Sequence, residues 1–322
     1  MATRLHRKDT SGPSHFHRPF AGLFGMCRRV RNVDGHGVDP VRRIDAGRCL
    51  DCLGRGVFRG RVCASPSWAF VFFNEEGKWL RHEFQSAMTA VEICASTIRD
   101  VAVAMEAGAD RVELCSVWSV GGITPNVVVV EAAASMGMPV HALIRPREGS
   151  FIHTTSERAW AAEEAKVMLD CGAERVVVGG LCEEGTLDET YLDAMLDAAG
   201  DPERLVWNRA IDASKDALSD ARVLLANVVR AVLTSGGAIR AVEGSARIES
   251  FIDLGMQVVA GGGVQPEDVE TLAALGVEAV HASCRATTAS DASPLFDTAV
   301  HLVDYEKVCA LVDACESWRS KA

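Results

Sequence analysis

Short aliphatic runs alternate with longer amphipathic stretches throughout the sequence after residue 88, and this alternation limits the fold more than any other feature. Apolar residues at every second position indicate strands, whereas a period near 3.6 residues indicates helices. We expect strands at 91–94, 111–115, 140–144, 175–179, 204–208, 229–234, 257–261 and 279–283. Helices are expected at 97–107, 125–136, 156–171, 188–198, 216–225, 241–254, 266–275 and 304–318.

Strand–helix units of this kind build a parallel sheet whose faces are covered by helices. Residues 88–322 hold eight such units, which is the number and roughly the length of a (β/α)8 barrel, or TIM barrel. A doubly wound open sheet is the alternative. Units of nearly equal length with no second domain favour a closed ring, so the predicted fold is an α/β TIM barrel over residues 88–322.

Residues 1–87 differ from the rest of the chain in composition. They contain 15 basic and 8 acidic residues and show no sustained helical or strand period. We expect a basic extension of low order without a packed core. Met88 immediately precedes the first expected strand, so a start assigned too early is an alternative explanation. Cys49 and Cys52 have the spacing of half a zinc ribbon, but the sequence has no second close pair.

The charge of the remaining chain restricts its partners. Residues 88–322 contain 18 basic and 36 acidic residues, which argues against nucleic-acid binding because such binding uses clustered cations. No apolar run reaches the roughly 18 residues of a membrane helix. The eleven cysteines are scattered through the chain, and no convincing secretory signal is present. We therefore expect a reduced, cytoplasmic protein without nucleic-acid or membrane partners.

The first two expected strands repeat one pattern, in which a glutamate stands two residues before a cysteine. Glu92 and Cys94 share one face of their strand, as do Glu113 and Cys115, because side chains alternate along a strand. If the strands are neighbours, the two thiols and the two carboxylates can meet in pairs. Paired thiolates select Cu(I) or another soft ion, with Cys284 as an additional sulfur. The alternative is that these thiols are small buried apolar groups.

Carboxylates inside apolar strands indicate either a buried ion pair or acid/base chemistry. Glu92 and Glu113 are candidates for both. His281, on the last expected strand, and Asp212, after the fifth, are candidate catalytic residues as well. A hydrogen-bonded core histidine is the alternative for His281.

Three arginines follow the expected ends of strands three, five and eight. In a TIM barrel, functional residues lie at these carboxyl ends, so Arg145, Arg209 and Arg285 could converge on one carboxylate or phosphate. Glycine-rich loops after strands six and seven would let backbone N–H groups reach the same anion. The alternative is that the arginines pair with Glu92, Glu113 and Asp212.

These motifs together resemble the CutC family of copper homeostasis proteins. The resemblance covers essentially all of residues 90–285, in order and at similar spacing, and no single motif carries it. It rests on Val-Glu-Ile-Cys at 91–94, Gly-Ala-Asp-Arg-Val-Glu-Leu-Cys at 108–115, Gly-Gly-Ile-Thr-Pro at 121–125, Ile-Arg-Pro-Arg at 144–147, Leu-Thr-Ser-Gly at 233–236, Gly-Gly-Gly at 261–263 and His-Ala-Ser at 281–283.

The resemblance implies a TIM barrel, a cytosolic role in copper handling, and copper binding at Cys94 and Cys115. It leaves the biochemical activity open. One position departs from the family pattern, because Asn208 stands where relatives typically have histidine, so any role of that imidazole does not carry over.

Two functions follow from these residues. The first is a copper homeostasis protein that binds Cu(I) through Cys94 and Cys115 at the barrel mouth. The second is a barrel enzyme that acts on a small anionic metabolite, a phosphate or carboxylate. A homo-oligomer is compatible with either function, because barrel helices often carry dimer contacts.

Overall fold

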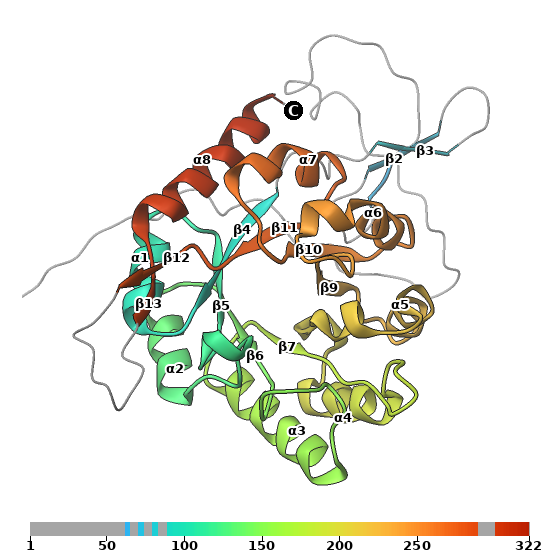
Figure 1. The fold of residues 1–322 in the computed structure, drawn as a ribbon. Coiled ribbons are helices and arrows are strands. Elements are labelled where there is room, and N and C mark those ends of the chain that lie inside the picture. Colours follow the sequence, from blue (N-terminus) through green and yellow to red (C-terminus); the bar gives the residue numbers. More distant parts are fainter. Residues whose placement is uncertain (1–61, 65–69, 74–78, 83–88, 289–299, 322) are drawn as a thin grey trace, which may run out of the picture. The chain divides into compact units, whose positions relative to one another are not determined.

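The computed structural model describes residues 62–64, 70–73, 79–82, 89–288 and 300–321. Eight parallel strands form a closed barrel in which each strand pairs with the next and β11 pairs with β4 (Figure 1). The predicted TIM barrel is confirmed. The strands of the ring are β4 (Ala90–Ala95), β5 (Arg111–Leu114), β6 (Val140–Leu143), β7 (Arg175–Val178), β8 (Leu205–Trp207), β9 (Ala231–Thr234), β10 (Gln257–Gly261) and β11 (Ala279–Ala282).

Helices surround the ring in the order expected from the sequence (Figure 1). Capping residues explain where several begin: Thr97 and Asp100 form a capping box at the start of α1, and Asp188 accepts a hydrogen bond from Tyr191 N at the start of α4. The helices are α1 (Ile98–Glu106), α2 (Val127–Ser135), α3 (Thr155–Asp170), α4 (Glu189–Ala199), α5 (Ala217–Ala226), α6 (Ser245–Asp253), α7 (Val269–Ala274) and α8 (Tyr305–Lys321).

Two small antiparallel sheets were not expected from the sequence. Between β11 and α8, the strands β12 (Arg285–Thr288) and β13 (Val300–Val303) pair with each other. Within residues 1–87, three short strands form one sheet, namely β1 (Val62–Ala64), β2 (Phe70–Phe73) and β3 (Trp79–His82). Cys49, Cys52 and Met88 lie outside the described residues, so the zinc-ribbon and start-site interpretations stay predictions.

Apolar side chains pack on both sides of the ring. The larger core lies between strands and helices and includes the fully buried Trp207, Tyr191 and Phe251. A smaller cluster combines Cys94 and Cys115 with aliphatic side chains of the other strands, among them Leu143, Val177 and Val259. Among the described residues, no helix is long and apolar enough to span a membrane.

Candidate functional site

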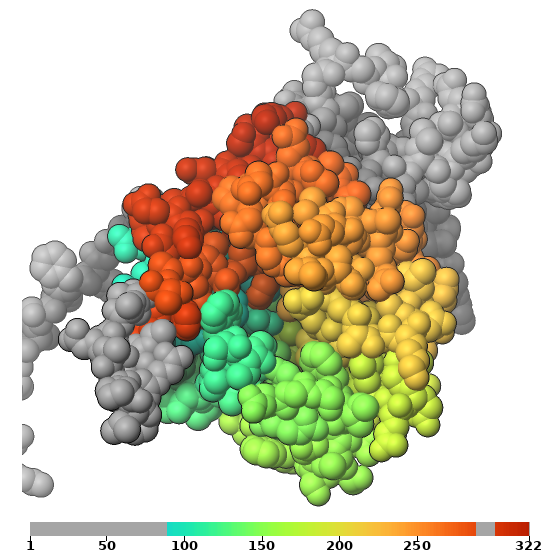
Figure 2. All heavy atoms as spheres, viewed as in Figure 1, coloured from blue at the N-terminus to red at the C-terminus, as the bar shows by residue number. Residues whose placement is uncertain are grey.

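A cavity of about 910 Å³ is lined by residues at the carboxyl ends of the barrel strands and in the loops that follow them. In Figure 2 the barrel face is hollowed near its centre, where the teal, green and orange segments meet. Of the nine catalytic, ligand-binding and metal residues predicted from the sequence, Glu92 does not line this cavity. The other eight do: Cys94, Glu113, Cys115, Arg145, Arg209, Asp212, His281 and Arg285. The placement follows the rule for TIM barrels.

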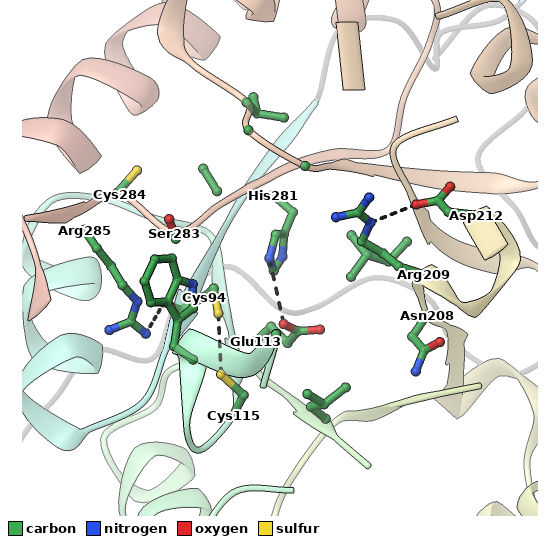
Figure 3. A pocket seen from close by; sticks show the side chains of 18 of the residues that line it. Cys94, Glu113, Cys115, Asn208, Arg209, Asp212, His281, Ser283, Cys284 and Arg285 are labelled. Atoms are coloured by element: carbon green, nitrogen blue, oxygen red, sulfur yellow. Dashed lines mark hydrogen bonds and ion pairs between the residues drawn. The ribbon is translucent and has the colours of Figure 1, made fainter. Parts of the chain in front are cut away.

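Two thiols from neighbouring strands meet in the cavity. Cys94 Sγ lies 3.6 Å from Cys115 Sγ, and both side chains are buried (Figure 3). The pKa of Cys115 falls to about 7, because Cys94 and Ser96 donate hydrogen bonds to it and Arg285 lies near, although burial opposes this. The pKa of Cys94 rises through the same hydrogen bond and through burial. The hydrogen bond between the sulfurs therefore favours ionisation of Cys115 and keeps a proton on Cys94.

Glu92 is held inside the ring by three cationic or imidazole partners. Its Oε2 is 2.6 Å from Arg111 Nε and 2.9 Å from His141 Nδ1, the latter out of line for a hydrogen bond. Its Oε1 is 2.8 Å from His281 Nδ1. Burial opposes ionisation, but the Arg111 guanidinium and the two histidines outweigh it and hold the pKa of Glu92 well below its usual range. Glu92 is thus a structural anion.

The prediction that the two carboxylates meet is wrong, because the ring of His281 lies between Glu92 and Glu113. Residue 92 pairs with residue 111 across the ladder, and Cys94 pairs with Glu113. The ring of His281 lies between the acids, with Nε2 3.8 Å from Glu113 Oε2. The pKa of Glu113 rises to about 8 through burial and the negative charge of Glu92, against the attraction of His281. Its Oε1 is buried and has no hydrogen-bond partner in the part of the chain that the structure describes.

Arg145 is fixed by backbone oxygens. Its guanidinium donates to the carbonyls of Val120, Gly122 and Gly149 at 2.7 to 3.0 Å and lies 5.3 Å from the centre of the Phe151 ring. Among the described residues, it has no ion pair with a carboxylate within 4 Å. Its positive charge is therefore available to an anion in the cavity.

Arg209 and Asp212 form an ion pair at 2.8 Å, as the structural alternative predicted. The Asp212 carboxylate also accepts hydrogen bonds from Thr234 Oγ1, Ser235 N and Gly237 N. The loop after β9 thus binds a carboxylate of the chain itself, which occupies N–H groups predicted for an external anion. Asp212 is saturated with donors and acts as a structural residue in this arrangement.

Arg285 ties the last strand to the first at the mouth of the cavity. It donates to Cys94 O at 3.1 Å and Ser96 Oγ at 2.8 Å, and its guanidinium lies 5.2 Å from the Trp118 ring centre (Figure 3). The thiol of Cys284 contacts Lys307 O at 3.7 Å and points away from the cysteine pair in Figure 3. Cys284 is therefore not the additional sulfur that the sequence suggested.

Three donor atoms of different chemistry lie close together where these groups meet. Cys94, Glu113 and His281 each offer one atom, and these atoms lie within 4.8 Å of one another. The group combines sulfur, oxygen and nitrogen, which are ligands for a metal ion. It joins the first two strands of the ring to the last.

The sequence model of the CutC family matches residues 89–286. The chain belongs to the CutC family. A CutC family protein of Agrobacterium fabrum is 32% identical over 211 residues, which cover 64% of this chain and 81% of that protein. A CutC family protein of Pasteurella multocida is 30% identical over 198 residues, which cover 60% and 81%.

A solved CutC structure agrees with the barrel. The crystal structure of CutC from Streptococcus agalactiae, named as a candidate copper homeostasis protein, covers 61% of this chain and 99% of its own chain. The sequences are 26% identical and the TM-score is 0.57. The CutC match contains every strand of the ring and ends inside β12.

Asn208 stands at the position where the resemblance to the CutC family implied a histidine. Its Oδ1 accepts a hydrogen bond from Ala210 N at 2.8 Å and caps the short helix at Arg209–Ala213. The side chain lines the cavity and is 4% exposed. In this CutC chain the position supplies an amide to the cavity wall and cannot supply a ligand nitrogen or a proton carrier.

Sequence reasoning missed Arg111 and His141 as partners of Glu92. Both stand on strands that the sequence predicted, so their presence inside the barrel could have been anticipated. Arg111 is the first residue of β5 and also forms a bidentate pair with Glu278 at 2.7 and 2.9 Å. The stagger between strands, which the sequence does not specify, brings Arg111 beside Glu92.

Proposed function

We propose that this CutC protein takes part in copper homeostasis by binding Cu(I) between Cys94 and Cys115. The observation that carries the proposal is the separation of 3.6 Å between the two sulfurs inside the cavity. Two adjacent thiolates form a soft donor set, which favours Cu(I) over hard cations. The family assignment supports the same function, as does the name of the Streptococcus agalactiae relative.

The surroundings of the pair fit the binding of a cation as cargo. Ser96 lies 3.7 Å from the Cys115 sulfur, and Arg285 lies near enough to favour ionisation of both thiols. The seven cysteines within residues 89–288 and 300–321 are free thiols. A reducing compartment such as the cytoplasm keeps thiols free, and we place the protein there.

Copper binding is tested by titrating the reduced full-length protein with Cu(I) against a chromophoric chelator. We expect roughly one Cu(I) at the cysteine pair, and we expect that equivalent to disappear in the double variant Cys94→Ser with Cys115→Ser. The control is Cys171→Ser with Cys309→Ser, which removes two thiols that do not line the cavity. Equal copper binding by the two double variants would contradict the proposal.

A second candidate function is an enzyme that acts on a small anionic metabolite. The observation that favours it is the convergence of Arg145, Arg209 and Arg285 on the cavity that also exposes Glu113 and His281. Arginine binds carboxylate and phosphate groups through its fork of donors. Glu113 and His281 would then move protons at the bound anion.

Ligand binding of this kind is tested by thermal shift with sugar phosphates and carboxylic acids. A ligand that binds only the folded state adds about 2.7 kcal/mol to stability at one hundred times its Kd, so we expect a higher melting temperature with a matching anion. Arg209→Gln, at a half-exposed position, should reduce the shift. The absence of any shift across both compound classes would remove this candidate function.

A further inference from the structure

His281 is oriented as a metal-binding histidine. Its Nδ1 lies 2.8 Å from Glu92 Oε1, which leaves Nε2 directed toward Glu113 (Figure 3). Metal-bound histidines almost always donate their other ring N–H to a carboxylate or carbonyl, because this fixes the tautomer and makes the free nitrogen more basic. Arg111 holds Glu92 in place. The carboxylate behind the histidine is therefore positioned before any metal arrives.

Glu113 provides a carboxylate oxygen, Oε1, that makes no hydrogen bond to any described residue. The residue is 5% exposed, and its Oε1 has no hydrogen-bond partner among the described residues. A buried polar atom without a partner destabilises a fold by about 1–3 kcal/mol. A metal ion bound to this carboxylate would satisfy it, and the side chain already lines the cavity from which an ion would enter.

Cys94 completes a set of three donors. The ligand atoms of Cys94, Glu113 and His281 lie within 4.8 Å of one another. Glu113 Oε2, the other oxygen of the carboxylate that carries Oε1, is 3.8 Å from His281 Nε2. Around a tetrahedral zinc ion with bonds of 2.0 to 2.3 Å, neighbouring ligand atoms are roughly 3.3 to 3.8 Å apart. The three donors therefore stand within about 1 Å of that geometry.

We infer that Cys94, Glu113 and His281 form a binding site for a divalent ion of the zinc class, distinct from the cysteine pair. A mixed set of sulfur, oxygen and nitrogen suits zinc, whereas Cu(I) selects thiolates. Three protein ligands leave the fourth position of a zinc ion open, which is the pattern of catalytic sites. The open position faces a cavity whose walls include three arginines.

The proposed metal ion and Arg145 would lie in one cavity, so an anion could bind there beside the ion. A thiolate and a carboxylate balance the two charges of the ion, and the histidine binds as a neutral ligand. An anionic substrate that enters the cavity could then contact both the ion and the free charge of Arg145. Zinc activates bound water and polarises carbonyl or phosphoryl oxygens, so the substrate class is a small phosphate or carboxylate ester open to hydrolysis.

The inference does not depend on copper binding, although the two sites share Cys94. A divalent ion requires Glu113 and His281, whereas Cu(I) at the cysteine pair requires Cys115. Occupancy of one site therefore excludes full occupancy of the other. Variants at Glu113 and at Cys115 separate the two inferences.

The experiment is a titration of the reduced full-length protein with Zn²⁺ and with Co²⁺, each metal alone. Co²⁺ bound by a thiolate in a four-coordinate site gives a near-ultraviolet charge-transfer band and intense visible bands. We expect these bands in the wild type and a loss of zinc affinity on the order of a hundredfold or more in Glu113→Gln, since even outer partners change metal affinity by 10 to 100-fold. His281→Asn should behave in the same way.

Cys115→Ser is the matched control. It should keep the cobalt bands and the zinc affinity but lose Cu(I), whereas Glu113→Gln should lose the cobalt bands but keep Cu(I). Circular dichroism of the metal-free variants checks that they fold, and Glu113→Gln suffices alone if His281→Asn does not fold. Cobalt bands and zinc affinity that stay at wild-type level in Glu113→Gln would place the metal elsewhere and overturn the inference.

Discussion

Arg111→Met lowers the free energy of unfolding by about 3 to 5 kcal/mol, the loss expected when one partner of a buried ion pair is removed. Arg111 is 11% exposed and contacts both Glu92 and Glu278, so methionine leaves the Glu92 carboxylate buried with histidines alone. Urea denaturation at neutral pH measures the change. Methionine keeps most of the side-chain volume, so lost packing contributes little.

The pH dependence of this loss identifies its cause. The pKa of Glu92 is lowered in the folded wild type. The contribution of the Glu92 carboxylate to the free energy of unfolding is therefore complete above its unfolded pKa, near 4.3, and is lost as the pH falls through its folded pKa. The difference between wild type and variant should therefore shrink only in acid. The control is Arg147→Met, which breaks a half-exposed pair with Glu157 and should change stability much less, because surface ion pairs contribute little. Equal losses in both variants would contradict the role of the buried pair.

Gly244→Ala is expected to destabilise the protein by about 3 kcal/mol, at the upper end of ordinary overpacking. A Cβ at Gly244 would lie 2.0 Å from the carbonyl oxygen of Ser235 and 2.8 Å from Gly236 Cα, and both are backbone atoms. The φ of Gly244 is −90°, which alanine adopts freely, so crowding alone accounts for the loss. The displaced loop is the one that binds Asp212, so the Arg209 ion pair should loosen as well.

Gly276→Ala is the control for this prediction. Gly276 has a φ of +89°, but a Cβ there meets nothing within 4 Å, so alanine at this position suffers only backbone strain of about 1–2 kcal/mol. Both free energies of unfolding come from urea denaturation of the full-length chain. A loss in Gly244→Ala no larger than in Gly276→Ala would show that the loop after β9 moves aside without effect.

The fold was predictable because each strand–helix unit is encoded locally. Aliphatic runs and capping residues predict every strand of the ring and every surrounding helix. Thr97 and Asp188 show why: each stands directly before the helix whose first turn it caps. The β12–β13 pair escaped prediction because one of its strands, Arg-Ala-Thr-Thr at 285–288, lacks a clear alternation of apolar and polar side chains.

The sequence predicts which residues line the site but not which of them contact one another. The rule that TIM-barrel function lies at strand ends selects Cys94, Cys115 and Arg145 from the sequence alone. Which groups touch depends on neighbours that the sequence does not place: Cys94 meets Cys115 across the two strands, whereas the ring of His281 stands between Glu92 and Glu113. Loop conformations decide the rest, since Asp212 is tied up by the loop after β9.

Closure of the ring between β11 and β4 has a consequence for the order of events during folding. His281 pairs with Glu92 across this last seam, although 189 residues separate them in the chain. A nascent or cleaved chain that lacks β11 can bring the two thiols together but lacks the His281 imidazole of the proposed divalent site. Contacts between such distant residues form late, because a long loop must close first. Retention of a divalent metal would thus show that the barrel has closed between β11 and β4. Contact between the two thiols would show only that β4 and β5 have paired.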